Sequence, residues 1–190
     1  MKALLIVDMQ NDFMPGGALA VPKGDALLPI INSLMDDFTL IVASQDTHTH
    51  DHTSFVVNGG TWPVHCVKDT QGYELASSLY KAKINAIFPK GQDKKIDSYS
   101  AFFDNEHLQA TGLGDFFKAR EVTDLYLVGV ATEYCVLFSA LDALQLGFNV
   151  FIIADACAGI DIQPGDSLRA LEQIQSQGGH VISSCQALLR

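Results

Sequence analysis

The densest group of metal-binding side-chain types in the chain lies at residues 45–52, in the stretch QDTHTHDH. Three of the six histidines, His48, His50 and His52, fall within it, and Asp46 precedes them. Asp46 and His48 are two residues apart, so in an extended segment their side chains point to the same side. Imidazole nitrogens together with a carboxylate oxygen suit zinc, iron or manganese. The stretch therefore predicts a site for one divalent metal ion rather than a solvated polar loop.

Two more histidines are candidates for the same site. His52 lies four residues beyond His48 and reaches the site if the loop turns, and His65 returns to it from the stretch WPVHC. The expected ligands are Asp46, His48, His52 and His65. Alternation along the stretch would equally select His50, so the ligand set stays open at that position.

A cysteine in GVATEYC has the position of a nucleophile, because Cys135 follows an apolar run and begins a predicted helix. A helix N-terminus stabilises negative charge, so it lowers a thiol pKa, and its N–H groups can hold an oxyanion. Asp8 and Lys90, each at the end of an apolar run, are the candidate base and cation. Cys66, beside His65, is the rival nucleophile. Taken singly, such residues are more often a small buried cysteine, a turn-capping aspartate and a solvated lysine.

The elements that must position these residues alternate along the chain. Apolar runs rich in β-branched residues predict strands at 3–8, 39–44, 85–90, 125–130, 148–155 and 180–184. Apolar residues at spacings of three and four predict helices over 25–36, 72–82, 133–146 and 166–177. This alternation predicts an α/β fold, a three-layer α/β/α sandwich with a central six-stranded, mostly parallel sheet, in one domain spanning 1–190.

The candidate residues are expected to meet at one edge of this sheet, because ligands of open α/β sheets bind beyond the carboxyl ends of the strands. The side chains that end or follow four of the predicted strands are Asp8, Asp46, Lys90 and Cys135. The polar stretches 45–72 and 91–105 are longer than ordinary connections, and long loops in compact domains are often functional.

The composition restricts the classes of partner. The formal net charge of −10 and the pI of about 4.8 argue against nucleic acid or an anionic membrane, since both select basic surfaces. No apolar run approaches the roughly 20 residues of a membrane span, and MKALLIVD lacks the pattern of a signal peptide. The spacing of the four cysteines fits free thiols in a reducing cytoplasm. We therefore expect a cytoplasmic protein with a small-molecule partner, and a homo-oligomer stays open.

Several short motifs follow one another over nearly the whole chain. They are VDMQNDF (7–13) with GGAL (16–19), QDTHTHDH (45–52), WPVHC (62–66), FPKG (88–91), YSAF (99–102) and GVATEYCV (129–136). Together they resemble the nicotinamidases, also called pyrazinamidases, of the isochorismatase-like cysteine hydrolases. DALQLGFNV (142–150) and IQPGDS (162–167) further resemble the enteric-bacterial type. The resemblance implies the same three-layer α/β/α fold.

The resemblance also implies roles for particular residues. The catalytic triad it implies is Asp8, Lys90 and Cys135. The metal ligands it implies are Asp46, His48, His52 and His65. The residues it places around a pyridine ring are Phe13 and Trp62, with Tyr99 and Tyr134 near that pocket. The oxyanion hole it implies consists of the N–H groups of Ala131 and Cys135, with a cis peptide at Val130–Ala131. In two departures, Glu133 stands where many relatives carry Asp, and Tyr134 where others carry His.

The activity that the resemblance implies is hydrolysis of nicotinamide to nicotinate and ammonia through a thioester, a step of NAD salvage. Pyrazinamide and other pyridine or pyrazine carboxamides are expected substrates, and one divalent ion (Zn, Fe or Mn) is the expected cofactor. A sibling amidohydrolase acting on a carbamoyl compound or ureidoacrylate would share the Asp–Lys–Cys set but generally lack the metal cluster. An isochorismatase would not need the cysteine. A non-catalytic metal- or redox-sensing protein would bind metal without releasing ammonia.

Overall fold

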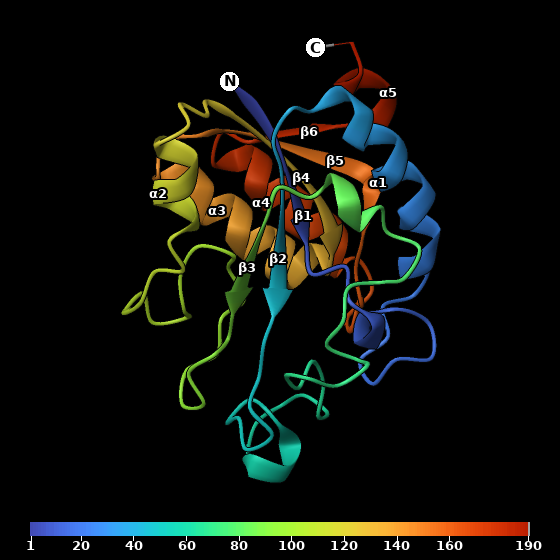
Figure 1. Cartoon of the computed structure of the whole chain (residues 1–190), viewed down its shortest axis with the longest axis vertical. Coiled ribbons are helices and arrows are strands. Elements are labelled where there is room, and N and C mark those ends of the chain that lie inside the picture. Colours follow the sequence, from blue (N-terminus) through green and yellow to red (C-terminus); the bar gives the residue numbers. More distant parts are fainter. Residues whose placement is uncertain (190) are drawn as a thin grey trace.

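A six-stranded sheet forms the centre of the computed structural model, which describes residues 1–189 (Figure 1). Its strands are β1 (Lys2–Val7), β2 (Ile41–Asp46), β3 (Ala86–Lys90), β4 (Asp124–Val130), β5 (Asn149–Ala158) and β6 (His180–Ile182). They lie in the order β3-β2-β1-β4-β5-β6, and every neighbouring pair is parallel. All six predicted strands are confirmed, as is the parallel α/β sheet.

Helices cover both faces of this sheet (Figure 1). They are α1 (Leu28–Leu34), α2 (Leu113–Lys118), α3 (Leu137–Gln145), α4 (Asp166–Ser176) and α5 (Ser184–Ala187). Alternate strand residues belong to two separate apolar cores. Leu4 and Ile6 pack in the core of α1 and α5, whereas Leu5 lies in the core of α2, α3 and α4. The continuous apolar runs of the sequence therefore arise from strands that are buried on both faces.

One predicted helix, over 72–82, is wrong. Its apolar residues are buried, but the backbone pairs with a distant segment instead of with itself. The N–H of Ala76 donates to the carbonyl of Met9 at 2.8 Å, and the N–H of Asn11 donates to the carbonyl of Glu74 at 2.9 Å. The only helical element that overlaps the range is a short 3-10 turn, Lys81–Lys83, at its end. The short helices α2 and α5 were not predicted.

The chain order of the strands reverses between β1 and β4. From β1 the chain moves outward through β2 to β3, and it then crosses back to β4 on the other side of β1. Such a reversal leaves a crevice at the carboxyl ends of the strands, where ligands bind in open α/β sheets. The start of β1 and the last helix, α5, lie at the opposite end of the sheet (Figure 1). Within residues 1–189, none of the helices has the length and apolar character needed to cross a membrane.

Candidate active site

Four chain segments deliver polar side chains to the crevice. Asp46 and Lys90 are the last residues of β2 and β3 and are paired in register across these strands. Asp8 directly follows β1, with a left-handed backbone φ of 49°. Cys135 lies in a π-helical turn, Thr132–Val136, between β4 and α3. The structure therefore brings together the residues that the sequence predicted from strand ends.

Lys90 is the centre of this cluster. Its Nζ lies 3.0 Å from Oδ2 of Asp8 and 3.1 Å from Oδ1 of Asp46, and it donates to the carbonyl of Ser98 at 2.7 Å. The same atom lies 3.5 Å from Sγ of Cys135. Burial alone would lower the pKa of Lys90, but the Asp46 and Asp8 carboxylates raise it well above its usual value. The ammonium is therefore charged, fully buried and within reach of the thiol.

Asp8 has the environment of a proton acceptor. Its side chain is 0% exposed, and the Ser44 hydroxyl donates to Oδ1 at 2.7 Å. Burial raises the pKa of Asp8, while the Lys90 ammonium acts in the opposite direction. A carboxylate whose pKa is raised binds a proton more readily, so Asp8 is suited to accept one from a neighbouring group.

The expectation that a helix start lowers the pKa of Cys135 is wrong. Burial raises the thiol pKa well above its usual value, and the Lys90 ammonium only partly offsets this. The raised pKa favours the protonated thiol, so the attacking sulfur needs a neighbouring group that accepts its proton. The rival thiol of Cys66 is also buried with a raised pKa, and it packs in the core of α1, on the opposite face of the sheet from Cys135.

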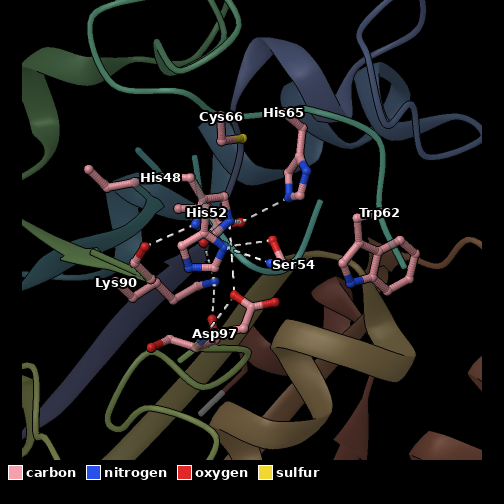
Figure 2. Close-up of polar contacts among 12 residues, drawn as sticks. His48, His52, Ser54, Trp62, His65, Cys66, Lys90 and Asp97 are labelled. Atoms are coloured by element: carbon pink, nitrogen blue, oxygen red, sulfur yellow. Dashed lines mark hydrogen bonds and ion pairs between the residues drawn. The ribbon is translucent and has the colours of Figure 1, made fainter. Parts of the chain in front are cut away.

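Three of the four predicted metal ligands converge directly, and the two histidines among them are labelled in Figure 2. The donor atoms of Asp46, His48 and His65 all lie within 4.8 Å of one another. Oδ2 of Asp46 is 3.0 Å from Nε2 of His48 and 3.4 Å from Nε2 of His65. All three side chains are buried.

The Nδ1 atoms of His48 and His65 point away from the three-residue group, and their hydrogen bonds determine which ring nitrogen is left for a metal ion. Nδ1 of His48 lies 2.9 Å from the carbonyl of Gly91, and Nδ1 of His65 lies 2.8 Å from the carbonyl of Pro63. A carbonyl only accepts, so each Nδ1 carries a proton, which leaves Nε2 of the neutral ring as the atom that can bind a metal ion. Metal-binding histidines have this arrangement of outer partners. The residues present fit a divalent metal ion.

His52 lies beside the group of Asp46, His48 and His65 but is not one of its three members. Its ring centroid is 4.1 Å from that of His48, and its Nδ1 lies 2.7 Å from Oγ of Ser54. Its Nε2 is buried with no hydrogen-bond partner in the described part of the chain. His52 forms a second, overlapping donor group with His48 and Asp97. His50, which alternation left open, is exposed.

Asp97 was missed by the sequence reasoning. It lies in the long stretch 91–105, and its Oδ1 is 4.0 Å from Nε2 of His48 (Figure 2). Its side chain is 15% exposed and lines the same cavity as Cys135. The sequence does carry one signal for Asp97, which lies two residues before Tyr99 in DSYSAF. A carboxylate next to a motif that is expected to line the pocket is a candidate for binding a ligand there.

Gly91 is required by the packing around His48. Its φ is +66°, and an added Cβ would lie 2.6 Å from Cε1 of His48 and 3.0 Å from Oδ1 of Asp46. We expect Gly91→Ala to displace these donors and to weaken zinc binding by at least about tenfold, the lower end of the effect of disturbing outer-sphere partners. Isothermal titration with zinc measures this.

The matched control for this prediction is Gly59→Ala. Gly59 also has a positive φ, of +92°, but an added Cβ would meet no atom within 4 Å. The control should keep zinc affinity, even if the strained backbone lowers stability. Equal zinc affinity in both variants would contradict the role assigned to Gly91.

The cavity at the cluster is lined by all four side chains expected around a substrate ring. They are Phe13, Trp62, Tyr99 and Tyr134. The indole N–H of Trp62 donates to the Tyr99 hydroxyl at 3.1 Å, and Tyr134 packs edge-on against Trp62 at 5.0 Å. Leu19 and Ile160 add apolar walls that the sequence did not predict. The lining suits a flat aromatic ring whose polar groups face Cys135 and the histidines.

The turn that carries the thiol has the expected cis peptide bond at Val130–Ala131. Ala131 and Cys135 both line the cavity. The backbone of the π-helical turn therefore lies at the same wall of the cavity as the sulfur.

Fold and site together define an α/β/α hydrolase in which a buried thiol, ammonium and carboxylate are grouped beside a candidate metal site. The chain belongs to the isochorismatase family, whose domain matches residues 2–186. It is 43% identical to a nicotinamidase of Escherichia coli strain K12, over 93% of this chain and 92% of that protein.

Two solved structures share the fold throughout. A pyrazinamidase of Pyrococcus horikoshii in complex with zinc is 41% identical, with a TM-score of 0.86, over 96% of this chain and 98% of that one. A protein named PnC1 from L. infantum, in complex with nicotinate, is 37% identical, with a TM-score of 0.94, over 97% of this chain and 93% of that one.

Proposed function

We propose that this chain hydrolyses nicotinamide to nicotinate and ammonia, as a cysteine amidohydrolase in a single domain spanning 1–190. The observation that carries the proposal is the position of Lys90, which contacts Asp8, Asp46 and Cys135 at one end of an aromatic-lined cavity. The relatives named nicotinamidase and pyrazinamidase, and the relative that binds nicotinate, support this substrate class. Pyrazinamide, a ring analogue, is a second expected substrate.

The thiol chemistry follows from the neighbours of Cys135. Sγ attacks the carboxamide carbon, and its proton passes to Asp8, whose pKa is raised by burial. Lys90 stabilises the charge that moves between the sulfur and the carboxylate. Asp8 then returns the proton to the leaving ammonia, and water hydrolyses the nicotinoyl thioester. The N–H groups of Ala131 and Cys135 are the proposed donors to the oxyanion.

The proposed metal ligands are Asp46, His48 and His65, with His52 beside them. When bound, a zinc, iron or manganese ion would supply a Lewis acid for the pyridine nitrogen and so orient the ring. Asp97 borders the same space and is suited to accept a hydrogen bond from a ligand there. Phe13 and Trp62 enclose the ring, with Tyr99 and Tyr134 near them.

The decisive experiment is ammonia release from nicotinamide by the purified protein, with and without a chelator. Release that the chelator suppresses supports the substrate class and the metal together. Metal-replete protein that releases no ammonia would refute the proposal. It would favour a sibling amidohydrolase, in which the thiol, ammonium and carboxylate act on another small amide. Metal binding with no amide hydrolysis at all would favour a sensor.

His48→Ala is expected to lower the amount of bound metal and to raise KM for nicotinamide. His48 contributes a buried Nε2 to the donor group, so its loss removes one ligand and the contact that holds Asp46. Elemental analysis measures metal per chain. His50→Ala is the matched control, because His50 is an exposed histidine two residues away. Unchanged metal content in His48→Ala would contradict the ligand assignment.

We also propose a reducing, cytoplasmic setting. Cys66, Cys135, Cys157 and Cys185 are all free thiols, which is typical of proteins in reducing compartments.

A further inference from the structure

Glu133 lies two residues before Cys135, and its carboxylate is buried, with the residue 9% exposed. The carboxylate reaches the segment that follows β5. Its Oε1 accepts hydrogen bonds from the N–H groups of Ile160 and Asp161, both at 2.7 Å, and its Oε2 accepts one from the Ser167 hydroxyl at 3.3 Å. One side chain on the π-helical turn that carries Cys135 therefore holds the connection between β5 and α4.

The backbone of this connection is shaped around the carboxylate. Asp161 has a left-handed φ of 50°, which lets two successive N–H groups point to one oxygen. The side chain of Asp161 then accepts the N–H of Ser167 at 2.8 Å, at the start of α4. Hydrogen bonds to a charged acceptor are stronger than those between neutral groups, so this contact determines where the segment lies.

The chain at Gly159 approaches the carboxylate closely. A Cβ added at Gly159 would lie 2.2 Å from Oε2 of Glu133 and 2.0 Å from Oγ of Ser167. A side chain at position 159 would therefore displace the carboxylate or the Ser167 hydroxyl that it binds. The position of Glu133 and the path of residues 159–161 depend on each other.

Ile160 connects this anchor to the substrate cavity. Its side chain lines the cavity together with Phe13 and Leu19, while its N–H is one of the two held by Glu133. We propose that Glu133 is a positioning residue that sets the size of ring the cavity accepts, by holding Ile160 against it. This role rests on the proposed function.

The test compares nicotinamide with 5-methylnicotinamide as substrates. Glu133→Ala leaves the N–H groups of Ile160 and Asp161 without their acceptor, so the wall moves outward. The ratio of kcat/KM for the larger amide to that for nicotinamide is expected to rise about tenfold, the scale of one methyl group in an apolar pocket. KM for nicotinamide should rise while kcat changes less, because the thiol and its neighbours are retained.

Four further variants make the test specific. Glu133→Gln keeps an acceptor oxygen and the shape, so it should restore much of the wild-type ratio. Glu133→Asp withdraws the carboxylate by one methylene and should also raise the ratio. It replaces the alanine variant in the test if that variant does not fold. Ile160→Ala should raise the ratio directly. Glu172→Ala makes the same chemical change as Glu133→Ala at an exposed position of α4 and should leave the ratio unchanged.

A double-mutant cycle closes the argument. If Glu133 acts through Ile160, the effects of Glu133→Ala and Ile160→Ala on the ratio will not add, because the second change removes a wall that has already moved. Folded Glu133 variants with the wild-type ratio, or effects that add fully, would overturn the role of Glu133 while the proposed function stands. Wild-type protein that hydrolyses neither amide would overturn both.

Discussion

Cys135→Ala is expected to reduce kcat/KM for nicotinamide by about 10⁴-fold or more, as removal of a catalytic nucleophile does in other covalent hydrolases. The sulfur is the attacking atom, and nothing of similar nucleophilicity replaces it when the side chain ends at Cβ. Metal content should be unchanged, because the donor group of Asp46, His48 and His65 does not include the thiol. Ammonia release and elemental analysis on the same preparation measure both quantities.

The matched control is Cys66→Ala, which removes the second buried cysteine near the site. Cys66 packs in the core of α1, so its loss should affect stability more than turnover. Turnover retained by Cys135→Ala, or abolished equally by both variants, would contradict the assignment of the nucleophile.

Lys90→Met is expected to lower the free energy of unfolding by about 3–5 kcal/mol, the usual cost of removing one partner from a buried ion pair. The ammonium lies 3.0 Å from Asp8 and 3.1 Å from Asp46, and both carboxylates are almost completely buried. Without it, two like charges remain in a region of low dielectric. Urea unfolding of the metal-free protein at neutral pH measures the difference, and ammonia release should be lost as well.

Lys94→Met is the control for this prediction. Lys94 pairs with Asp51 at 3.0 Å, but both side chains are largely exposed. Water and salt screen such a pair, so we expect no measurable change in stability. Similar losses in the two lysine variants would contradict the claim that burial makes Lys90 important.

The penalty of Lys90→Met should shrink on acidification. Burial raises the pKa of Asp46, but in the wild type His48 and Lys90 together hold it below its usual value. The stabilising effect of ionised Asp46 is therefore present above the usual carboxyl pKa and is lost as pH falls through the lowered pKa. The pKa of Asp8 is raised by burial, so Asp8 takes up a proton first. Once the carboxylates are neutral, Lys90 has no charge to balance, and the two proteins converge in stability.

The parts of the site that end strands were predictable from sequence. Asp8, Lys90 and Cys135 each end or follow an apolar run, and parallel strands bring such positions to one edge. Periodicity failed at 72–82, because the buried spacing of Leu75 and Leu79 suits a helix equally well. That segment is held by a backbone contact to Met9, which no local pattern reveals.

Other features of the site depend on tertiary packing alone. Asp97 and Ile160 reach the cavity from irregular segments, whose paths are fixed by long-range hydrogen bonds rather than by periodicity. The pKa of Cys135 was predicted in the wrong direction, because a helix start indicates local charge stabilisation but gives no measure of burial. The contact of Glu133 with Asp161 depends on a left-handed backbone that the residue type does not require.

Trp62 is the one tryptophan in the sequence, and it is 8% exposed at the wall of the cavity. Its indole N–H is held by the Tyr99 hydroxyl at 3.1 Å. The intrinsic fluorescence of the protein excited at the indole band therefore comes from this single place. The emission intensity should therefore change when a ligand ring occupies the cavity, so that binding can be measured without a label and without turnover. The variants that lose catalysis can thus still be titrated with nicotinamide.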